Sequence, residues 1–131
     1  MLFFKKPVTS FETITLHLSG MRYICEYEIV CGGETSEISR YGLNFHEGKK
    51  ERVLDARVTR DTSEILQILN KCNVIGWNGF HGAHPRGVLD GTMFGFDAAV
   101  NGGVKIRADG SQNFPRHFHD FRQYVEDQIR N

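Results

Sequence analysis

Apolar and polar residues alternate along the first half of the chain, with the period of two that is typical of strands with one buried face. The series begins with Ile14, Leu16 and Leu18, which are separated by a threonine and a histidine. The same alternation predicts three further strands, over residues 23–31, 39–45 and 54–58. The links between these strands are short and contain glycine or polar residues, so the pattern predicts an antiparallel meander in place of parallel βαβ units.

The alternation also assigns a buried face to each predicted strand, because successive side chains point to opposite faces of a sheet. The apolar sets expected to face the core are Tyr23, Cys25, Tyr27, Ile29 and Cys31, then Tyr41, Leu43 and Phe45, then Leu54, Ala56 and Val58. The charged residues between these positions are expected to face solvent.

After residue 60 the period becomes that of a helix. Apolar residues fall on one helical face at Ile65, Leu66, Ile68, Leu69 and Cys72. Asp61 and Glu64 precede this run at the spacing of a capping box, in which the Asp carboxylate accepts a backbone amide of the first turn. Lys71 and Asn73 stand where a helix of this kind ends.

Glycine punctuates residues 76–91, which are predicted to form a long loop. Alternation returns over 93–100 and 104–108, and Asn101-Gly102 between them predicts a tight hairpin turn. A closing helix is predicted to begin within two residues of Pro115 and to end near residue 129. Its buried face is expected to hold Phe118, Phe121, Val125 and Ile129, and its exposed face Arg122, Glu126 and Arg130.

Together these elements predict one α+β domain over residues 1–131. Its architecture is expected to be an antiparallel β-meander of five to seven strands with two helices packed on one face. A chain of 131 residues with 40% apolar content is long and apolar enough to build a core without disulfides or metal.

Charge and composition narrow the classes of partner. Sixteen basic residues balance sixteen acidic ones, which disfavours nucleic-acid binding. No apolar run approaches the roughly 18 residues that a membrane span needs, and the apolar side chains of Leu2, Phe3 and Phe4 are expected to dock on the domain's own core. Three cysteines without a CxxC pair are typical of a reducing compartment, which predicts a cytoplasmic protein.

Candidate chemistry is sparse. The candidate metal ligands are His81 and His84 in the glycine loop, Asp90 at its end and His117 beside the closing helix. Zinc needs three or four convergent ligands, and the chain has neither an H-E-x-x-H motif nor a cysteine cluster. Ser111 lacks the G-x-S-x-G context of a catalytic serine, and no phosphate-binding loop is present. The sequence therefore predicts no catalytic residue and no cofactor.

Three short signatures stand out in the second half of the chain. They are Trp77-Asn78-Gly79-Phe80, then Leu89-Asp90-Gly91 before Phe94, and then Gly110-Ser111 leading to Phe114-Pro115 and Phe118. Together they resemble a group of small uncharacterised bacterial proteins that carry W-x-G-F, L-D-G-x-x-aromatic and G-S-x-x-aromatic-P-x-x-F before a closing helix. The resemblance covers residues 74–121 and implies a small α+β fold, but it brings no activity, cofactor or catalytic residue.

These signatures have two interpretations. In the structural one, Asp90 fixes its loop through backbone amides, Gly110 supplies the turn into the closing helix, and Phe114 packs against Trp77. In the functional one, the same segments form the wall or edge of a binding site. The residues that would then contact a ligand or partner are Trp77, His81, His84, Arg86, Asp90 and Ser111.

The lack of a catalytic set favours a non-catalytic binding protein that acts by occupying a protein partner, as immunity and inhibitor proteins do. The alternative is a small-ligand binder or a metal-dependent hydrolase that uses the loop histidines. Stoichiometric zinc in the purified protein would favour the second class, and a co-purifying protein would favour the first.

Overall fold

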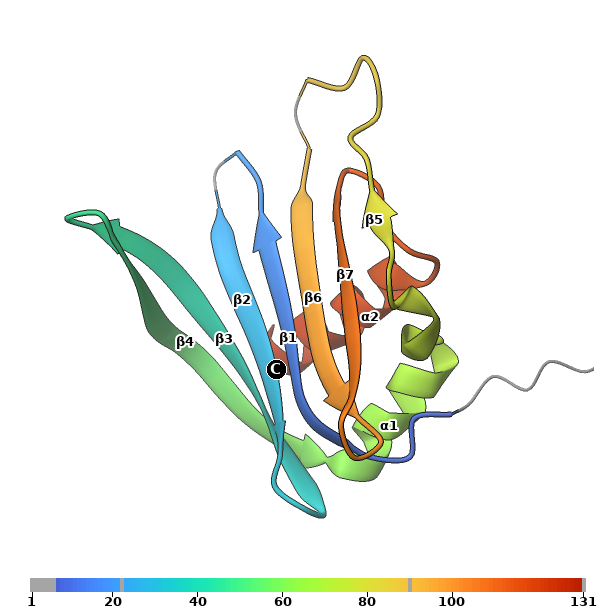
Figure 1. The fold of residues 1–131 in the computed structure, drawn as a ribbon. Coiled ribbons are helices and arrows are strands. Elements are labelled where there is room, and N and C mark those ends of the chain that lie inside the picture. The colour runs from blue at the N-terminus through green and yellow to red at the C-terminus, as the bar shows by residue number, and fades with distance from the viewer. Residues whose placement is uncertain (1–6, 22, 90, 131) are drawn as a thin grey trace, which may run out of the picture.

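The computed structural model describes residues 7–21, 23–89 and 91–130, which form one sheet with two α-helices packed against it (Figure 1). The predicted docking of Leu2, Phe3 and Phe4 lies outside these residues. The strands are β1 (Phe11–Ser19), β2 (Ile24–Cys31), β3 (Thr35–His46), β4 (Lys49–Asp61), β5 (His81–Gly82), β6 (Met93–Val100) and β7 (Val104–Ser111). The helices are α1 (Thr62–Lys71), the 3-10 helix η1 (Val74–Trp77) and α2 (Phe118–Arg130). The predicted α+β class is confirmed.

β1 lies inside the sheet and joins its two halves. The seven strands follow the order β4-β3-β2-β1-β6-β7-β5, and only β5 pairs in parallel, with β7. Leu16 of β1 stands opposite Tyr27 of β2 on one side and opposite Phe96 of β6 on the other. Two antiparallel runs, β1 to β4 and β6 to β7, therefore meet at β1.

The core lies between the sheet and the helices. The fully buried residues of α1 and α2 are Ile65, Leu69, Phe118, Phe121 and Val125, none more than 1% exposed. The Trp77 ring packs among the aromatic side chains of sheet and helix, with its centroid 5.0 Å from that of Phe96 and 5.7 Å from that of Phe121. The predicted buried positions Phe118, Phe121 and Val125 of the closing helix are confirmed.

The N-termini of both helices differ from prediction. Asp61 is the N-cap residue of α1, but its side chain makes no capping hydrogen bond. The Thr62 hydroxyl anchors this turn by donating to the Gly33 carbonyl at 2.6 Å. α2 begins at Phe118, so the predicted start within two residues of Pro115 is wrong. None of the helices in the described residues is long and apolar enough to cross a membrane.

Arg122 and Glu126 of α2 are less exposed than the sequence predicts. Their side chains keep only 24% and 20% of their accessible surface, and they pair with each other at 2.8 Å between Nε and Oε1. The expectation of two solvent-exposed side chains is wrong because β3 and β4 also contact α2. The helix is therefore covered over a wider arc than its apolar stripe indicates.

The β3–β4 hairpin departs from the predicted alternation. We call the helix-free face of the sheet the open face. Ile38 is 0% exposed and shares its face with Arg40, whereas Tyr41 lies on the open face. A register shift between Arg40 and Tyr41 places Ala56 opposite Arg40 and Leu54 opposite Tyr41. Leu54 and Ala56 therefore lie on opposite faces, and the expectation that they share one is wrong.

The predicted hairpin turn at Asn101-Gly102 is confirmed. Val100 pairs with Val104, and the two turn residues have positive φ angles of 50° and 75°. Asn101 also fixes the segment that precedes β1, because its Oδ1 accepts a hydrogen bond from the Thr9 amide at 2.8 Å. One side chain thus stabilises both the turn and the entry into β1.

Glu26 of β2 holds the β3–β4 hairpin to the sheet on the open face. Its side chain is 12% exposed and accepts hydrogen bonds from His17 Nδ1 at 3.1 Å and Lys50 Nζ at 3.3 Å. The Nε of Arg52 lies 3.2 Å from the same carboxylate, and this guanidinium packs 3.8 Å above the Tyr41 ring. Burial alone would raise the pKa of Glu26, but these hydrogen bonds and charges outweigh it and lower the pKa.

Replacing Glu26 with Gln is expected to lower the free energy of unfolding at pH 7 by about 1–3 kcal/mol, because hydrogen bonds to a charged acceptor are lost. The folded pKa lies below the unfolded one, so the stabilisation is complete above the unfolded pKa and disappears as the pH falls through the folded pKa. Urea denaturation from pH 7 down to pH 2 measures this dependence.

The matched control is Glu37→Gln, which removes a 57% exposed carboxylate of β3. We expect this change to shift the free energy of unfolding by about 0.5 kcal/mol or less, because an exposed ion pair is screened by solvent. Equal losses for the two variants at pH 7 would contradict a special role for Glu26.

Candidate functional site

The antiparallel topology gathers three connections at one end of the sheet. The β1–β2 turn, the β3–β4 turn and the loop between β5 and β6 lie at this end, and the β2–β3 and β6–β7 turns lie at the other (Figure 1). We call the first of these the loop end. Ser111, the last residue of β7, also reaches it. The loop end therefore brings the glycine loop of the sequence beside segments from the first half of the chain.

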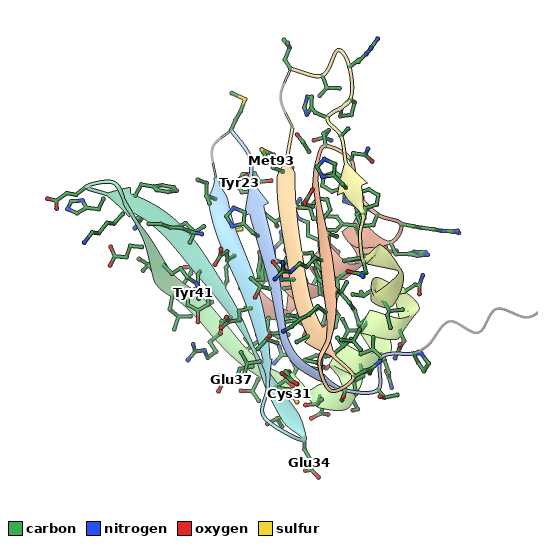
Figure 2. All side chains as sticks on the ribbon, viewed as in Figure 1. Tyr23, Cys31, Glu34, Glu37, Tyr41 and Met93 are labelled. Carbon is green, nitrogen blue, oxygen red and sulfur yellow. The ribbon has the colours of Figure 1, made fainter. Side chains whose placement is uncertain are left out.

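Large apolar side chains are exposed at the loop end. Leu89 is 97% exposed, Met21 75% and Met93 56%, and Tyr23 and Val88 are partly exposed beside them. Tyr23 and Met93 lie near each other at the top of the sheet (Figure 2), where the Tyr23 hydroxyl lies 3.0 Å from the hydroxyl of Thr92. We call these residues the apolar rim: Met21, Tyr23, Val88, Leu89 and Met93.

Each loop histidine pairs with a residue of β7. His81 Nδ1 pairs with the Asp109 carboxylate, and both side chains are exposed. His84 Nδ1 lies 2.7 Å from Ser111 Oγ, and its Nε2 donates to the Val88 carbonyl. A neutral imidazole that donates from Nε2 accepts at Nδ1, so it can take the proton of the Ser111 hydroxyl. These contacts hold the loop in place and create a Ser–His pair that the sequence did not predict.

The other candidate residues occupy different environments. Trp77 is 3% exposed and donates its indole N–H to the Arg116 carbonyl at 3.0 Å. Phe114 stacks on Phe118 at 4.8 Å, whereas the aromatic neighbours of Trp77 come from β6 and α2. Trp77 therefore anchors the start of the loop and offers little surface to a ligand. Arg86 is exposed in the loop, and Asp90 lies outside the described residues.

The candidate metal ligands do not converge in the part of the chain that the structure describes. Within residues 7–21, 23–89 and 91–130, no group of three or more His, Cys, Asp or Glu side chains is arranged to hold a metal ion. His117 Nδ1 lies 3.3 Å from Asp120 Oδ2 of α2, whereas His81 and His84 pair with β7 at the loop end. Each of these histidines thus has a hydrogen-bonding partner of its own.

Two glycines allow the glycine loop to pack against β7. Gly82 of β5 pairs with Gly110 of β7, and the Asn113 carbonyl lies over both. A Cβ atom added at either glycine would stand 2.3 Å from that carbonyl oxygen. The interpretation of Gly110 as the turn into the closing helix is wrong, because Gly110 lies within β7 and is needed for this close approach.

A second candidate site lies on the helix side of the sheet and was missed in the sequence. β2, β3 and α2 enclose a cavity of about 320 Å³ whose charged lining residues are Arg40, Arg122, Arg130 and Glu126. One signal could have found it, because Arg40 stands two residues after the buried Ile38 and therefore shares its face. The pairing of Arg122 with Glu126 across one helical turn was a second signal.

Comparisons with known proteins give no information on the function of this chain. No protein-family model, no curated protein and no solved structure matches this chain. The resemblance to the bacterial proteins with W-x-G-F signatures stays a prediction from its motifs.

Replacing Gly82 or Gly110 with Ala is expected to lower the free energy of unfolding by about 1–3 kcal/mol, because the new methyl group collides with a backbone carbonyl. The control is Gly42→Ala in β3, where a Cβ atom meets nothing within 4 Å. We expect that change to be neutral or slightly stabilising. Urea denaturation provides the measurement, and equal effects at Gly42 and Gly110 would argue against the close approach.

Proposed function

We propose that this protein is a non-catalytic binding protein that docks onto a protein partner through its loop end. The apolar rim carries the proposal. A Leu side chain gains about 1.5–3 kcal/mol when it is fully buried, and Leu89 at 97% exposure leaves that gain unused in the free protein. Several large apolar side chains left exposed at one end of the sheet favour an interaction surface there.

The surroundings of the rim support a protein partner. His84, Ser111 and Arg86 flank it with hydrogen-bonding groups, and protein interfaces typically combine an apolar centre with a polar border. Met and Tyr, both present in the rim, are enriched at such interfaces. His84, Arg86 and Ser111, three of the predicted contact residues, thus form the border, and the centre comes from apolar residues that the sequence did not single out.

The loop end is held in shape before any partner arrives. His84 is bonded to both Ser111 and Val88, and the Tyr23 hydroxyl contacts Thr92 across the two neighbouring connections. A surface that is already ordered loses less conformational entropy on binding, which favours high affinity from a small area. This property suits a protein that acts by occupying its partner, as inhibitors and immunity proteins do.

The test is site-specific photo-crosslinking in the native host. A benzophenone amino acid is placed at position 89 in the rim or, as the control, at position 104, where Val104 is 41% exposed at the opposite end of the sheet. We expect one discrete crosslinked protein from position 89 and none from position 104. The crosslinked partner is then purified, and its affinity for each variant is measured. We expect equal affinity for the wild type and the Val104→Asp variant, and at least about tenfold lower affinity for Leu89→Asp.

Two outcomes would count against the proposal. Crosslinking of the same proteins from both positions would show non-specific contact. A discrete partner whose affinity is the same for Leu89→Asp and for the wild type would place the interface elsewhere on the molecule.

The Ser111–His84 pair supports a second candidate function, ester hydrolysis. In that reaction the Ser111 hydroxyl attacks the ester carbonyl, its proton passes to His84 Nδ1, and the alcohol leaves to give an acyl-enzyme that water then hydrolyses. Turnover of p-nitrophenyl acetate tests it, with Ser111→Ala and the control Ser39→Ala on the open face. We expect the three proteins to release p-nitrophenol equally slowly, and loss of a burst in Ser111→Ala alone would favour the enzyme.

A further inference from the structure

We propose that the cavity between α2 and strands β2 and β3 binds a small organic carboxylate. The site lies on the helix side of the sheet and shares only Tyr23 with the apolar rim of the loop end. Its residues come from three elements: Tyr23 and Tyr27 at β2, Arg40 on β3, and Arg122, Glu126 and Arg130 on α2.

The charge of the described lining residues favours an anion. Three arginines face one carboxylate, which leaves two net positive charges on the lining. Glu126 is shared between Arg122 at 2.8 Å and Arg130 at 4.0 Å. Arg40 pairs with Asp55, which is 56% exposed and lies outside the cavity. The lining therefore keeps an excess of positive charge, which attracts an anion.

One buried donor in the site lacks a good acceptor. The Nε of Arg40 is buried and makes no hydrogen bond of good geometry to a described residue. Only this nitrogen is buried, because the Arg40 side chain is 40% exposed and its Nη1 pairs with Asp55. Buried polar atoms are nearly always hydrogen-bonded, so the unpaired Nε calls for an explanation. The Cys25 thiol of the neighbouring strand β2 interacts with Arg40, but it is only a weak acceptor, because burial raises its pKa and keeps it neutral. A carboxylate in the cavity would pair with the exposed part of the Arg40 guanidinium.

The shape and the remaining lining favour an organic body attached to the anion. A volume of about 320 Å³ lies at the lower end of the range for small-molecule sites. It is much larger than one oxyanion, and the tyrosine rings and Ile129 supply apolar contact. The Tyr27 hydroxyl is protonated at neutral pH, because burial raises its pKa to about 12, so it can donate to the ligand. The planar guanidinium groups match the planar carboxylate.

Benzoate is the probe, because it joins a carboxylate to an apolar ring of suitable size. The titration is followed by two-dimensional ¹H–¹⁵N NMR, including the arginine Nε–Hε signals. Benzamide, which has the same shape without the charge, and inorganic phosphate, which has charge without the ring, are titrated in parallel. We expect saturable shifts for residues of the cavity with benzoate, and at least about tenfold weaker binding of both other compounds.

The variants are Arg40→Met and Arg122→Met, with Arg57→Met as the matched control. Arg57 is also a strand arginine with an ion pair, to Glu37 at 3.6 Å, but it lies on the open face. We expect Arg40→Met to weaken benzoate binding at least about tenfold and Arg57→Met to leave it unchanged. Arg40→Lys keeps the charge and loses the planar group, so it should bind with intermediate affinity.

Four results would overturn the proposal. They are no saturable shift with benzoate up to tens of millimolar, equal binding of benzamide, preference for phosphate over benzoate, and equal loss in Arg40→Met and Arg57→Met. None of them bears on crosslinking from position 89, so the failure of this site and the failure of the proposed protein interface are distinguishable.

Discussion

The helical layer of this protein does not cover the full length of the longest strands. β3 and β4 have 12 and 13 residues, whereas β1, β2, β6 and β7 have eight or nine. The helices contact β3 and β4, but the part of this hairpin near its turn extends beyond them (Figure 1). Most other features of the molecule follow from this mismatch.

Charged side chains gather at the edge of the helical layer. On the helix side, β3 carries Arg40 at a position where an apolar residue would face a helix. The cavity lies there, between α2 and strands β2 and β3. On the open face no helix contributes, so Glu26 and its cationic partners stabilise the same hairpin by ion pairing. Tyr23 belongs both to the cavity and to the apolar rim, which places the two proposed sites side by side.

Alternation predicted the strands best where one face is buried along the whole strand. It identified the core-facing residues Cys25, Tyr27 and Ile29 of β2 and both strands of the β6–β7 hairpin, because burial there leaves a regular trace in the sequence. Tyr23, expected on the same buried face, instead precedes β2 and is 38% exposed. It failed for β3 and β4, where both faces are partly exposed and the extra residue Asp55 reverses the alternation between Leu54 and Ala56. A pattern read along one strand does not contain this information, since the register depends on the partner strand.

The candidate site was predictable only in part for a related reason. The glycine loop and its histidines were visible as composition, but His84 and Ser111 are 27 residues apart and meet because a two-residue strand, β5, pairs with β7. No local period predicts so short a strand. The apolar rim was missed because its members come from separate connections, and single exposed apolar residues are ordinary in any sequence.

Amide hydrogen exchange followed by NMR tests the mismatch between sheet and helices most directly. The account predicts slow exchange, close to the global unfolding limit, for the paired amides of β1 and β6, and exchange at least about 100-fold faster for the paired amides of residues 43–54. Protection of residues 43–54 equal to that of β1 would contradict it. That result would mean that the outer hairpin is as firmly held as the covered strands, and that the edge of the helical layer does not shape the sites beside it.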